Sequence, residues 1–232
     1  MIDNRKAIVA SGYDQVAQRY SEWSGGEQVR EHFLERFCDL LPPKGYVLDL
    51  GCGVPVAKRL SRQASVVGVD ISGTQISLAR QEVPEATFIQ ADMMAAEFPA
   101  ETFDGISAFF ALTHLPREEH LEMLSRIARW LRPGGIFVAS LGAGATDDAI
   151  EDNWLGVPMF FSHFDAETNK RLVRQAGLEV VHEEIVEHVE DDTPARFLWI
   201  IAKKSGSRRS TPSYAHIISR AAKYLNQAKS LI

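Results

Sequence analysis

YVLDLGCGVPVAKRL (residues 46–60) joins an apolar run to a glycine turn and a helical pattern. Residues 46–50 predict a buried strand, and Gly51 and Gly53 supply a turn where the backbone can come close to a ligand. Pro55 suits the first turn of the next helix, because the N–H that proline lacks would have no partner there. This order is typical of a nucleotide-binding turn in a doubly wound sheet.

The turn lacks the third glycine of the dinucleotide fingerprint, since Val56 stands three residues after Gly53. Asp49 closes the strand, so an anionic pyrophosphate would be unfavourable beside it and a cationic amine favourable. Taken alone, the two glycines are as compatible with a structural turn as with a ligand site.

Short apolar runs alternate with helical patterns on both sides of this turn. We predict an α/β fold with a Rossmann-like, doubly wound, seven-stranded sheet, mostly parallel with the last strand antiparallel, and helices on both faces. The expected strands cover 46–50, 65–71, 86–93, 103–112, 136–142, 178–188 and 195–203, and the main helices 3–21, 27–41, 73–83, 118–131 and 165–177.

Three parts are expected along the chain: an N-terminal helical cap (1–41), a catalytic domain (42–204), and a linker with a basic amphipathic helix (205–232). Residues 143–164 read as irregular and rich in aromatic residues. Such a segment is either a lid-like binding loop or a surface loop whose aromatic residues pack on the core.

Three acids close three successive predicted strands: Asp49, Asp70 and Asp92. The carboxyl ends of parallel strands share one sheet edge, where ligands bind in such folds. Asp70 is suited to the hydroxyls of a ribose, because Ser72 can cap the following helix in its place. Asp92 is suited to the amino group of an adenine.

Five motifs occur in order: VLDLGCG, VVGVDIS, FIQADM, FDGISAFFALTHL and LRPGG. Together they resemble the motifs of class I S-adenosylmethionine-dependent methyltransferases of the small-molecule type, over about residues 10–203. YDQVAQRY resembles the N-terminal helical lid of that family. One departure is the early Val54-Pro55, which shortens the glycine turn.

The resemblance implies S-adenosylmethionine as cofactor and assigns residues to its parts. The residues for the methionine moiety are Asp49, Gly51, Cys52 and Gly53, those for the ribose and adenine are Asp70, Ile71, Gln75, Asp92 and Met93, and those that border the sulfonium are Ala108 and Phe109. Tyr13 and Tyr20 are expected either to close over the cofactor or only to anchor the first helix.

An O or N acceptor must lose a proton, and a base with a pKa near neutrality suits that step. His114, just past the fourth predicted strand, is the first candidate base and His163 the second; either is also compatible with a structural or substrate-binding role. The candidate acceptor pocket is apolar, although core packing explains the same residues: Phe110, Trp154, Met159, Phe160 and Phe161.

Charge is unevenly distributed. From Lys203 onward there are seven basic and no acidic residues, so 18 basic and 31 acidic residues leave the first 202 with a formal charge of −13. An acidic body argues against nucleic acid as a partner. The basic C-terminal helix is expected to dock on this body, on a second subunit or on an anionic membrane surface.

Cys38 and Cys52 are the only cysteines, so neither a disulfide framework nor a cysteine-type zinc site is expected, and a reducing, cytoplasmic location fits. No other metal site is predicted. We expect methyl transfer from S-adenosylmethionine to an O or N atom of a small molecule. The alternatives are a non-catalytic protein that binds S-adenosylmethionine or S-adenosylhomocysteine and acts through partners, or an enzyme of the same fold with non-methyl chemistry in natural-product biosynthesis.

Overall fold

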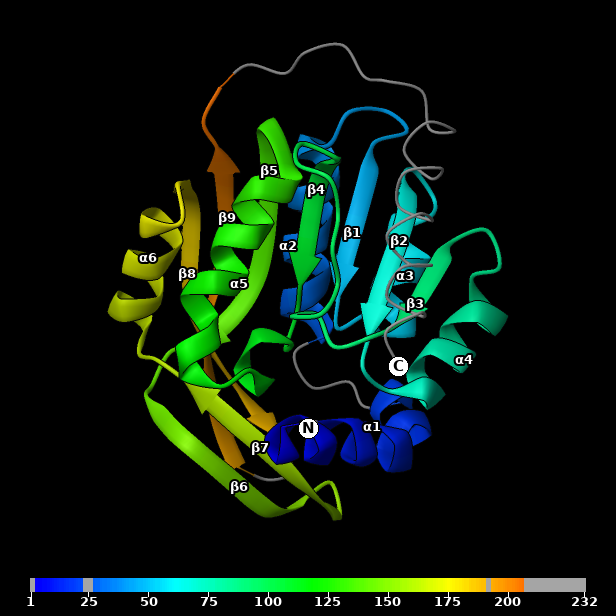
Figure 1. Cartoon of the computed structure of the whole chain (residues 1–232), viewed down its shortest axis with the longest axis vertical. Helices are drawn as coiled ribbons and strands as arrows, with labels where there is room; N and C mark the ends of the chain where they lie inside the picture. The colour runs from blue at the N-terminus through cyan, green and yellow to red at the C-terminus, as the bar shows by residue number, and fades with distance from the viewer. Residues whose placement is uncertain (1–2, 23–26, 191–192, 207–232) are drawn as a thin grey trace.

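A computed structural model describes residues 3–22, 27–190 and 193–206. Seven strands form one sheet in the order β3-β2-β1-β4-β5-β9-β8 (Figure 1). Strands β1 to β5 are parallel, and β9 runs antiparallel to both β5 and β8, which confirms the predicted fold class. The bounds are β1 Tyr46–Leu50, β2 Ser65–Asp70, β3 Thr87–Gln90, β4 Phe103–Ala108, β5 Leu131–Gly142, β8 Leu178–Glu190 and β9 Thr193–Lys204.

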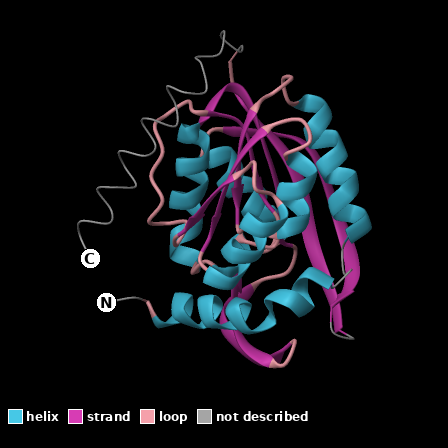
Figure 2. Ribbon diagram, turned by 90° about the vertical axis from the view of Figure 1, so that its right-hand side faces the viewer, coloured by secondary structure: helices cyan, strands magenta, loops and turns pink. Residues whose placement is uncertain are grey.

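Helices cover both faces of this sheet and make a three-layer molecule (Figure 2). On one face lie α2 (Glu27–Leu40), α3 (Val54–Leu60) and α4 (Gly73–Glu82), and on the other α5 (Arg117–Trp130) and α6 (Ala166–Gln175). Phe33 and Phe37 of α2 belong to the same buried cluster as Trp199 of β9. Leu124 of α5 packs in the opposite core with Leu48 of β1.

Helix α1 (Asn4–Glu22) lies outside these layers, across the carboxyl ends of the parallel strands (Figure 1). Val9 and Val16 of α1 share a buried cluster with Met159 and Phe160. The helix therefore covers the edge at which a doubly wound sheet binds its ligand.

The prediction of an irregular segment over 143–164 is wrong. Strands β6 (Thr146–Trp154) and β7 (Val157–His163) form a separate two-stranded antiparallel sheet. Leu155 and Gly156 join them with φ of 48° and 87°, and positive φ at both positions matches the twist of a tight hairpin. The side chains of β6 are mostly polar and exposed, so its sequence shows little of the apolar alternation expected of a strand.

Other element ends differ from expectation by a few residues. The third and fourth strands stop at Gln90 and Ala108, and a 3-10 turn, η1, follows over Leu112–His114. Phe110, with φ of 53°, turns the chain away from the sheet before η1 begins. Helix α3 begins at Val54, directly after Gly53, so the glycine turn is short because the helix starts early.

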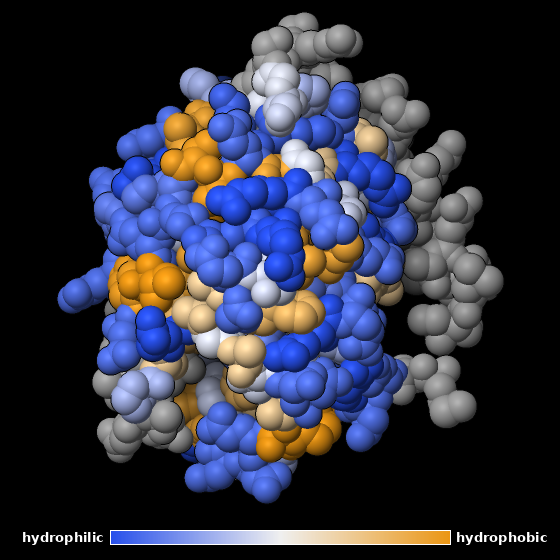
Figure 3. Space-filling model, turned by 90° about the vertical axis from the view of Figure 1, so that its left-hand side faces the viewer, coloured by the Kyte–Doolittle hydropathy of each residue, from blue (hydrophilic) through white to orange (hydrophobic). Residues whose placement is uncertain are grey.

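β8 forms one edge of the sheet, and β3 forms the other. Figure 3 looks onto the β8 side of the molecule, where separate hydrophobic patches lie in a largely hydrophilic surface. Val181 and Ile185 are about half exposed there, with glutamates at 183 and 184 between them. Charged side chains on an edge strand oppose pairing with another chain.

None of the described helices is long and apolar enough to cross a membrane. The expected basic helix in 205–232 lies almost wholly outside the described residues, which end at Gly206.

Candidate functional site

A cavity that is partly open to solvent lies at the carboxyl ends of β1, β2, β3 and β4, beneath α1. Its empty volume, with the open solvent space included, is about 650 Å³. Two smaller cavities share part of its wall, one beside the glycine turn and one against the hairpin. We call these the turn lobe and the aromatic lobe. Many of the predicted cofactor residues line the main cavity: Tyr13, Tyr20, Gly51, Gly53, Asp70, Ile71, Gln75, Asp92, Met93 and Phe109.

The glycine turn follows from steric limits at two positions. Gly51 has φ of +67°, and a Cβ there would lie 2.6 Å from the Cβ of Ala111. At Gly53 a Cβ would approach only Cδ of Pro55, at 3.7 Å. Gly53 lines both the main cavity and the turn lobe, so the volume a side chain would occupy is left for a ligand.

Asp49 lies two residues before Gly51 of the cavity wall, is almost fully buried and is not itself among the lining residues. One carboxylate oxygen accepts a hydrogen bond from the Ser107 hydroxyl at 2.7 Å, and the other has no partner among the described residues. Burial raises the pKa of Asp49 to about 7, the charge of Asp70 adds to this, and the bond from Ser107 opposes it. An unsatisfied buried carboxylate oxygen fits the cationic amine of S-adenosylmethionine.

Asp70 stands at the end of β2, in the cavity wall. Burial raises its pKa to about 7, with the charge of Asp14 as a smaller contribution. Ser72 caps α4 as expected and accepts from the backbone N–H of Gln75. Asp70 also has a structural role, however, because its carboxylate accepts a hydrogen bond from the backbone N–H of Ser72 at 2.8 Å.

Asp92 forms an ion pair with helix α1 of the N-terminal cap. One of its oxygens accepts from Nζ of Lys6 at 2.8 Å, and the other from the backbone N–H of Met94 at 2.9 Å. Lys6 also donates to Glu119 of α5 at 2.8 Å. Burial alone would lower the pKa of Lys6, but the hydrogen bonds to the two carboxylates outweigh it and raise that pKa.

His114 is buried in the wall shared by the main cavity and the aromatic lobe. Its Nδ1 lies 2.8 Å from the carbonyl oxygen of Phe160, which can only accept, so Nδ1 carries the proton. Nε2 therefore accepts from the hydroxyl of Tyr13 at 2.9 Å. Burial lowers the pKa of His114 to about 4, so this imidazole is neutral near pH 7.

The aromatic lobe is built from α1, the turn after β4, the hairpin and β9. Six Tyr, Phe and Trp side chains line it: Tyr13, Tyr20, Phe110, Trp154, Phe161 and Phe197. The Tyr13 and Tyr20 rings meet edge to face at 5.2 Å between centroids. The hairpin thus supplies an apolar wall to the cavity, although it is not the loop expected from the sequence.

Several predicted residues lie outside the lining of these cavities. Met159 and Phe160 are fully buried against α1. Cys52 is buried behind the turn and Ala108 in the sheet core, and neither faces the cavity. His163 bonds the carbonyl of Gly144 through Nδ1 at 2.7 Å, away from the cavity wall.

The sequence analysis missed several lining residues. Lys6 and Val9 project from α1 into the main cavity together with Tyr13 and Tyr20. Their positions (6, 9, 13 and 20) repeat at three, four and seven residues, a helical spacing that could have identified this face. Arg30 of α2 lines the turn lobe, and no local pattern marks it.

Comparison with known proteins agrees with this geometry. A family model described as a methyltransferase domain matches residues 47–135. An uncharacterized methyltransferase from Synechocystis is 32% identical over 174 residues, covering 69% of this chain and 79% of the relative. Other curated relatives are longer, and the chain spans 52% and 38% of two of them.

Solved structures share the fold at low identity. The [4+2]-cyclase SpnF matches with a TM-score of 0.64 and 19% identity, over 85% of this chain and 95% of SpnF. The 1,6-didemethyltoxoflavin-N1-methyltransferase of Burkholderia thailandensis, solved with S-adenosylhomocysteine bound, matches with a TM-score of 0.57 and 20% identity, over 85% and 91% of the chains.

The chain therefore belongs to the class I S-adenosylmethionine-dependent methyltransferases. Its cofactor is S-adenosylmethionine, and the buried unpaired oxygen of Asp49 and the open space at Gly53 fit that molecule.

Proposed function

We propose that this enzyme methylates an O or N atom of a small, largely apolar molecule that occupies the aromatic lobe. The observation that carries the proposal is the hydrogen bond from the Tyr13 hydroxyl to a neutral His114 in the wall between the cofactor edge and that lobe. O and N acceptors lose a proton on methylation, and this pair can take it.

The cofactor, when bound, supplies an already activated methyl group, so the protein has mainly to align the acceptor. We assign Asp49 to the cofactor amine and Arg30, in the turn lobe, to its carboxylate. Asp70 is suited to the ribose hydroxyls. Ile71 and Met93, from the ends of two neighbouring strands, are suited to the faces of the adenine.

The aromatic lobe selects the acceptor by its surface. Tyr20, Phe110, Trp154 and Phe161 present ring faces and edges, with the Thr113 hydroxyl as a polar group near them. Such walls favour a flat, apolar acceptor carrying one reacting hydroxyl or amine. Aromatic faces beside the reacting centre also attract a cationic sulfonium.

Proton removal is assigned to Tyr13 and His114 acting together. The acceptor proton passes to the Tyr13 oxygen while the Tyr13 proton passes to Nε2 of His114, which becomes cationic. Burial makes His114 a weak base at rest. A weak base is sufficient here, because the proton of the acceptor becomes strongly acidic as the methyl group is transferred. The low pKa also keeps Nε2 of His114 unprotonated before the reaction.

The test combines calorimetric titration with S-adenosylmethionine and mass-spectrometric assay of a panel of flat phenols and aromatic amines. We expect Tyr13→Phe to retain cofactor affinity within about threefold and to lower kcat by about 100-fold or more, the usual contribution of a general base. If Tyr13→Phe kept full turnover, the proposed transfer of the acceptor proton through Tyr13 to His114 would be wrong.

Two outcomes would favour the other candidate functions. Cofactor binding without product from any acceptor in the panel favours a non-catalytic cofactor-binding protein. Conversion of an acceptor without consumption of S-adenosylmethionine favours non-methyl chemistry.

A further inference from the structure

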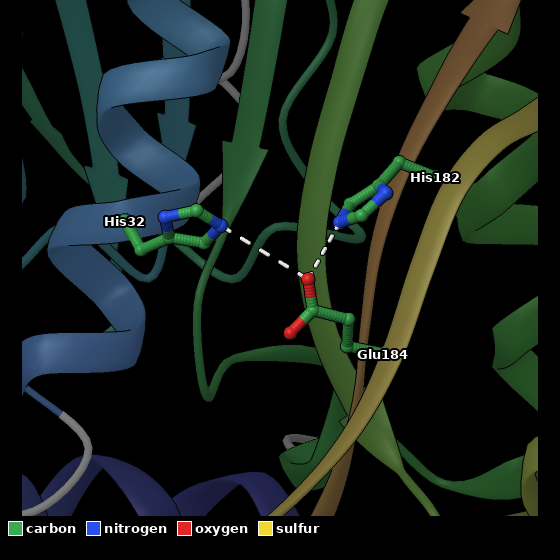
Figure 4. A group of neighbouring side chains, drawn as sticks. All are labelled: His32, His182 and Glu184. Atoms are coloured by element: carbon green, nitrogen blue, oxygen red, sulfur yellow. Dashed lines mark hydrogen bonds and ion pairs between the residues drawn. The ribbon is translucent and has the colours of Figure 1, made fainter.

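We propose that His32, His182 and Glu184 form a binding site for a zinc-type divalent metal ion on the outer surface, separate from the cofactor cavity. Figure 4 shows the carboxylate of Glu184 between the two imidazole rings. His32 belongs to α2 and the other two residues to β8, so the ion would join a helix to the edge strand of the sheet.

The donor atoms already converge. Nε2 of His182 lies 2.8 Å from Oε1 of Glu184, and Nε2 of His32 lies 4.0 Å from the same oxygen. All three donor atoms lie within 4.8 Å of one another. Ligands of a tetrahedral zinc ion lie about 3.3 Å apart, given bonds of ~2.0–2.1 Å. The two measured separations bracket that value, so small side-chain rotations would complete the geometry.

A β-bulge brings His182 to the face of the sheet that α2 covers. Val180 pairs with Ala202 of β9, but His182 pairs with Ile201, so Val181 is an extra residue in β8. In a regular strand, residues two apart share a face, and His182 would point to the same side as Val180. Val180 packs against the core beneath α5 and α6. The bulge therefore turns His182 to the opposite face.

After the bulge, the side chains of β8 continue to alternate from the new position of His182. Glu184 lies opposite Trp199, which belongs to the cluster that contains α2 residues. Phe33, the neighbour of His32 in α2, is fully buried and contacts the ring of His182, with the two rings tilted by 38° and their centroids 5.5 Å apart. A core residue of α2 thus fixes one ligand ring, and the helix presents His32 beside it.

The donor set selects the metal class. Two imidazoles and one carboxylate suit zinc, nickel or copper, whereas magnesium and calcium prefer oxygen ligands throughout. Without metal, Nε2–H of His182 donates to the carboxylate, and binding moves this proton to Nδ1. The side chains of His32, His182 and Glu184 are 50%, 24% and 43% exposed, so an ion can enter and keep water in its remaining coordination positions.

The test is calorimetric titration of Zn²⁺ into the full chain, prepared without a histidine tag. We expect one saturable site, weakened roughly tenfold or more by His182→Ala and by Glu184→Gln. Glu183→Gln is the matched control, because the neighbouring Glu183 bonds Lys170 of α6 on the other face. This variant should bind Zn²⁺ like the wild type, and Mg²⁺ should not bind.

A second readout tests the link between α2 and β8. Zn²⁺ should raise the Tm of the wild type and of Glu183→Gln, and leave that of His32→Ala unchanged. Co²⁺ should give visible absorption bands of a nitrogen- and oxygen-ligated ion that disappear in the variants. Equal Zn²⁺ affinity in the wild type and in the His32→Ala, His182→Ala double variant would overturn the proposal. A Kd above about 1 mM for the wild type would also overturn it, because a Kd of about 1 mM corresponds to a binding free energy of only about 4 kcal/mol.

Discussion

The hydroxyl of Ser72 donates a hydrogen bond to the carboxylate of Asp14 at 2.6 Å and so joins the N-cap of α4 to helix α1. The same oxygen of Asp14 accepts the backbone N–H of Thr74 at 3.0 Å. In the first turn of α1, Lys6 pairs with Asp92 and Arg5 pairs with Glu118 of α5. Polar contacts in the first turn and in the middle of α1 therefore hold the cap over the cofactor edge.

Replacing Asp14 tests this closure. We expect Asp14→Ala to raise the Kd for S-adenosylmethionine about fivefold, equivalent to about 1 kcal/mol, because hydrogen bonds to a partly exposed carboxylate are lost. Calorimetric titration measures it. Gln15→Ala is the control, since Gln15 is exposed and its side chain hydrogen-bonds Ser11 within α1. Equal affinity in the two variants would show that Asp14 does not hold the closed cap.

Asp49 and Asp70 predict a pH dependence for the cofactor-free protein. Their pKa values are raised from 3.8 to about 7 in the folded state. Their contribution to stability is therefore full below about pH 4 and is lost as pH rises through about 7. Urea unfolding at about pH 6 and about pH 8 should show a fall in the free energy of unfolding that Asp49→Asn reduces.

The same two groups link cofactor binding to protons. A cationic amine beside Asp49 favours its charged form, so binding should release protons near pH 7. Titrations in buffers of different ionisation enthalpy measure that release. Affinity that does not change between about pH 6 and about pH 7.5 would contradict the assignment of Asp49 to the amine.

Gly51 is expected to tolerate no side chain. Gly51→Ala should lower the free energy of unfolding by about 2–4 kcal/mol, because it combines a positive φ with a Cβ 2.6 Å from that of Ala111. Gly144→Ala is the matched control, since a Cβ there meets no atom within 4 Å. Urea unfolding of both variants checks this, and similar values for the two would mean that the turn relaxes freely.

His114→Asn separates the two bonds of the imidazole. Asparagine can still donate to the Phe160 carbonyl, but it offers no acceptor that replaces Nε2 for Tyr13. We expect kcat to fall about 10- to 100-fold with cofactor affinity retained. Steady-state kinetics measures this, and a variant with wild-type kcat would show that His114 takes no part in proton removal.

The variant should also change the response to acid. The pKa of His114 is lowered from 6.5 to about 4, so its contribution to stability is full above pH 6.5 and is lost as pH falls towards 4. The Tm of the wild type should therefore fall more than that of His114→Asn between about pH 7 and about pH 5. Parallel curves would contradict the buried, neutral state of His114.

The residues at the carboxyl ends of the parallel strands could be predicted from the sequence, because the patterns that mark them are local. Asp49 and Asp70 lie at the carboxyl ends of two buried strands, Gly51 directly follows the first of them, and the strand order brings the three together. The cap contacts could not be predicted in this way, because Lys6 and Asp92 are 86 residues apart and each looks like an ordinary surface charge. The hairpin was missed because the polar β6 carries no apolar alternation.

The β6–β7 hairpin has two roles at the site. Trp154 and Phe161 give the aromatic lobe its shape through side chains, whereas Phe160 orients His114 through a backbone carbonyl. A contact through a backbone carbonyl does not depend on which residue is at that position, but it does depend on the register of the strand. A shift of one residue turns every side chain of a strand to the other side. Substitutions of lobe-facing side chains in this hairpin should therefore change the shape of the aromatic lobe and leave the contact to His114 in place, whereas a single-residue insertion or deletion in β7 should displace the tyrosine–histidine pair.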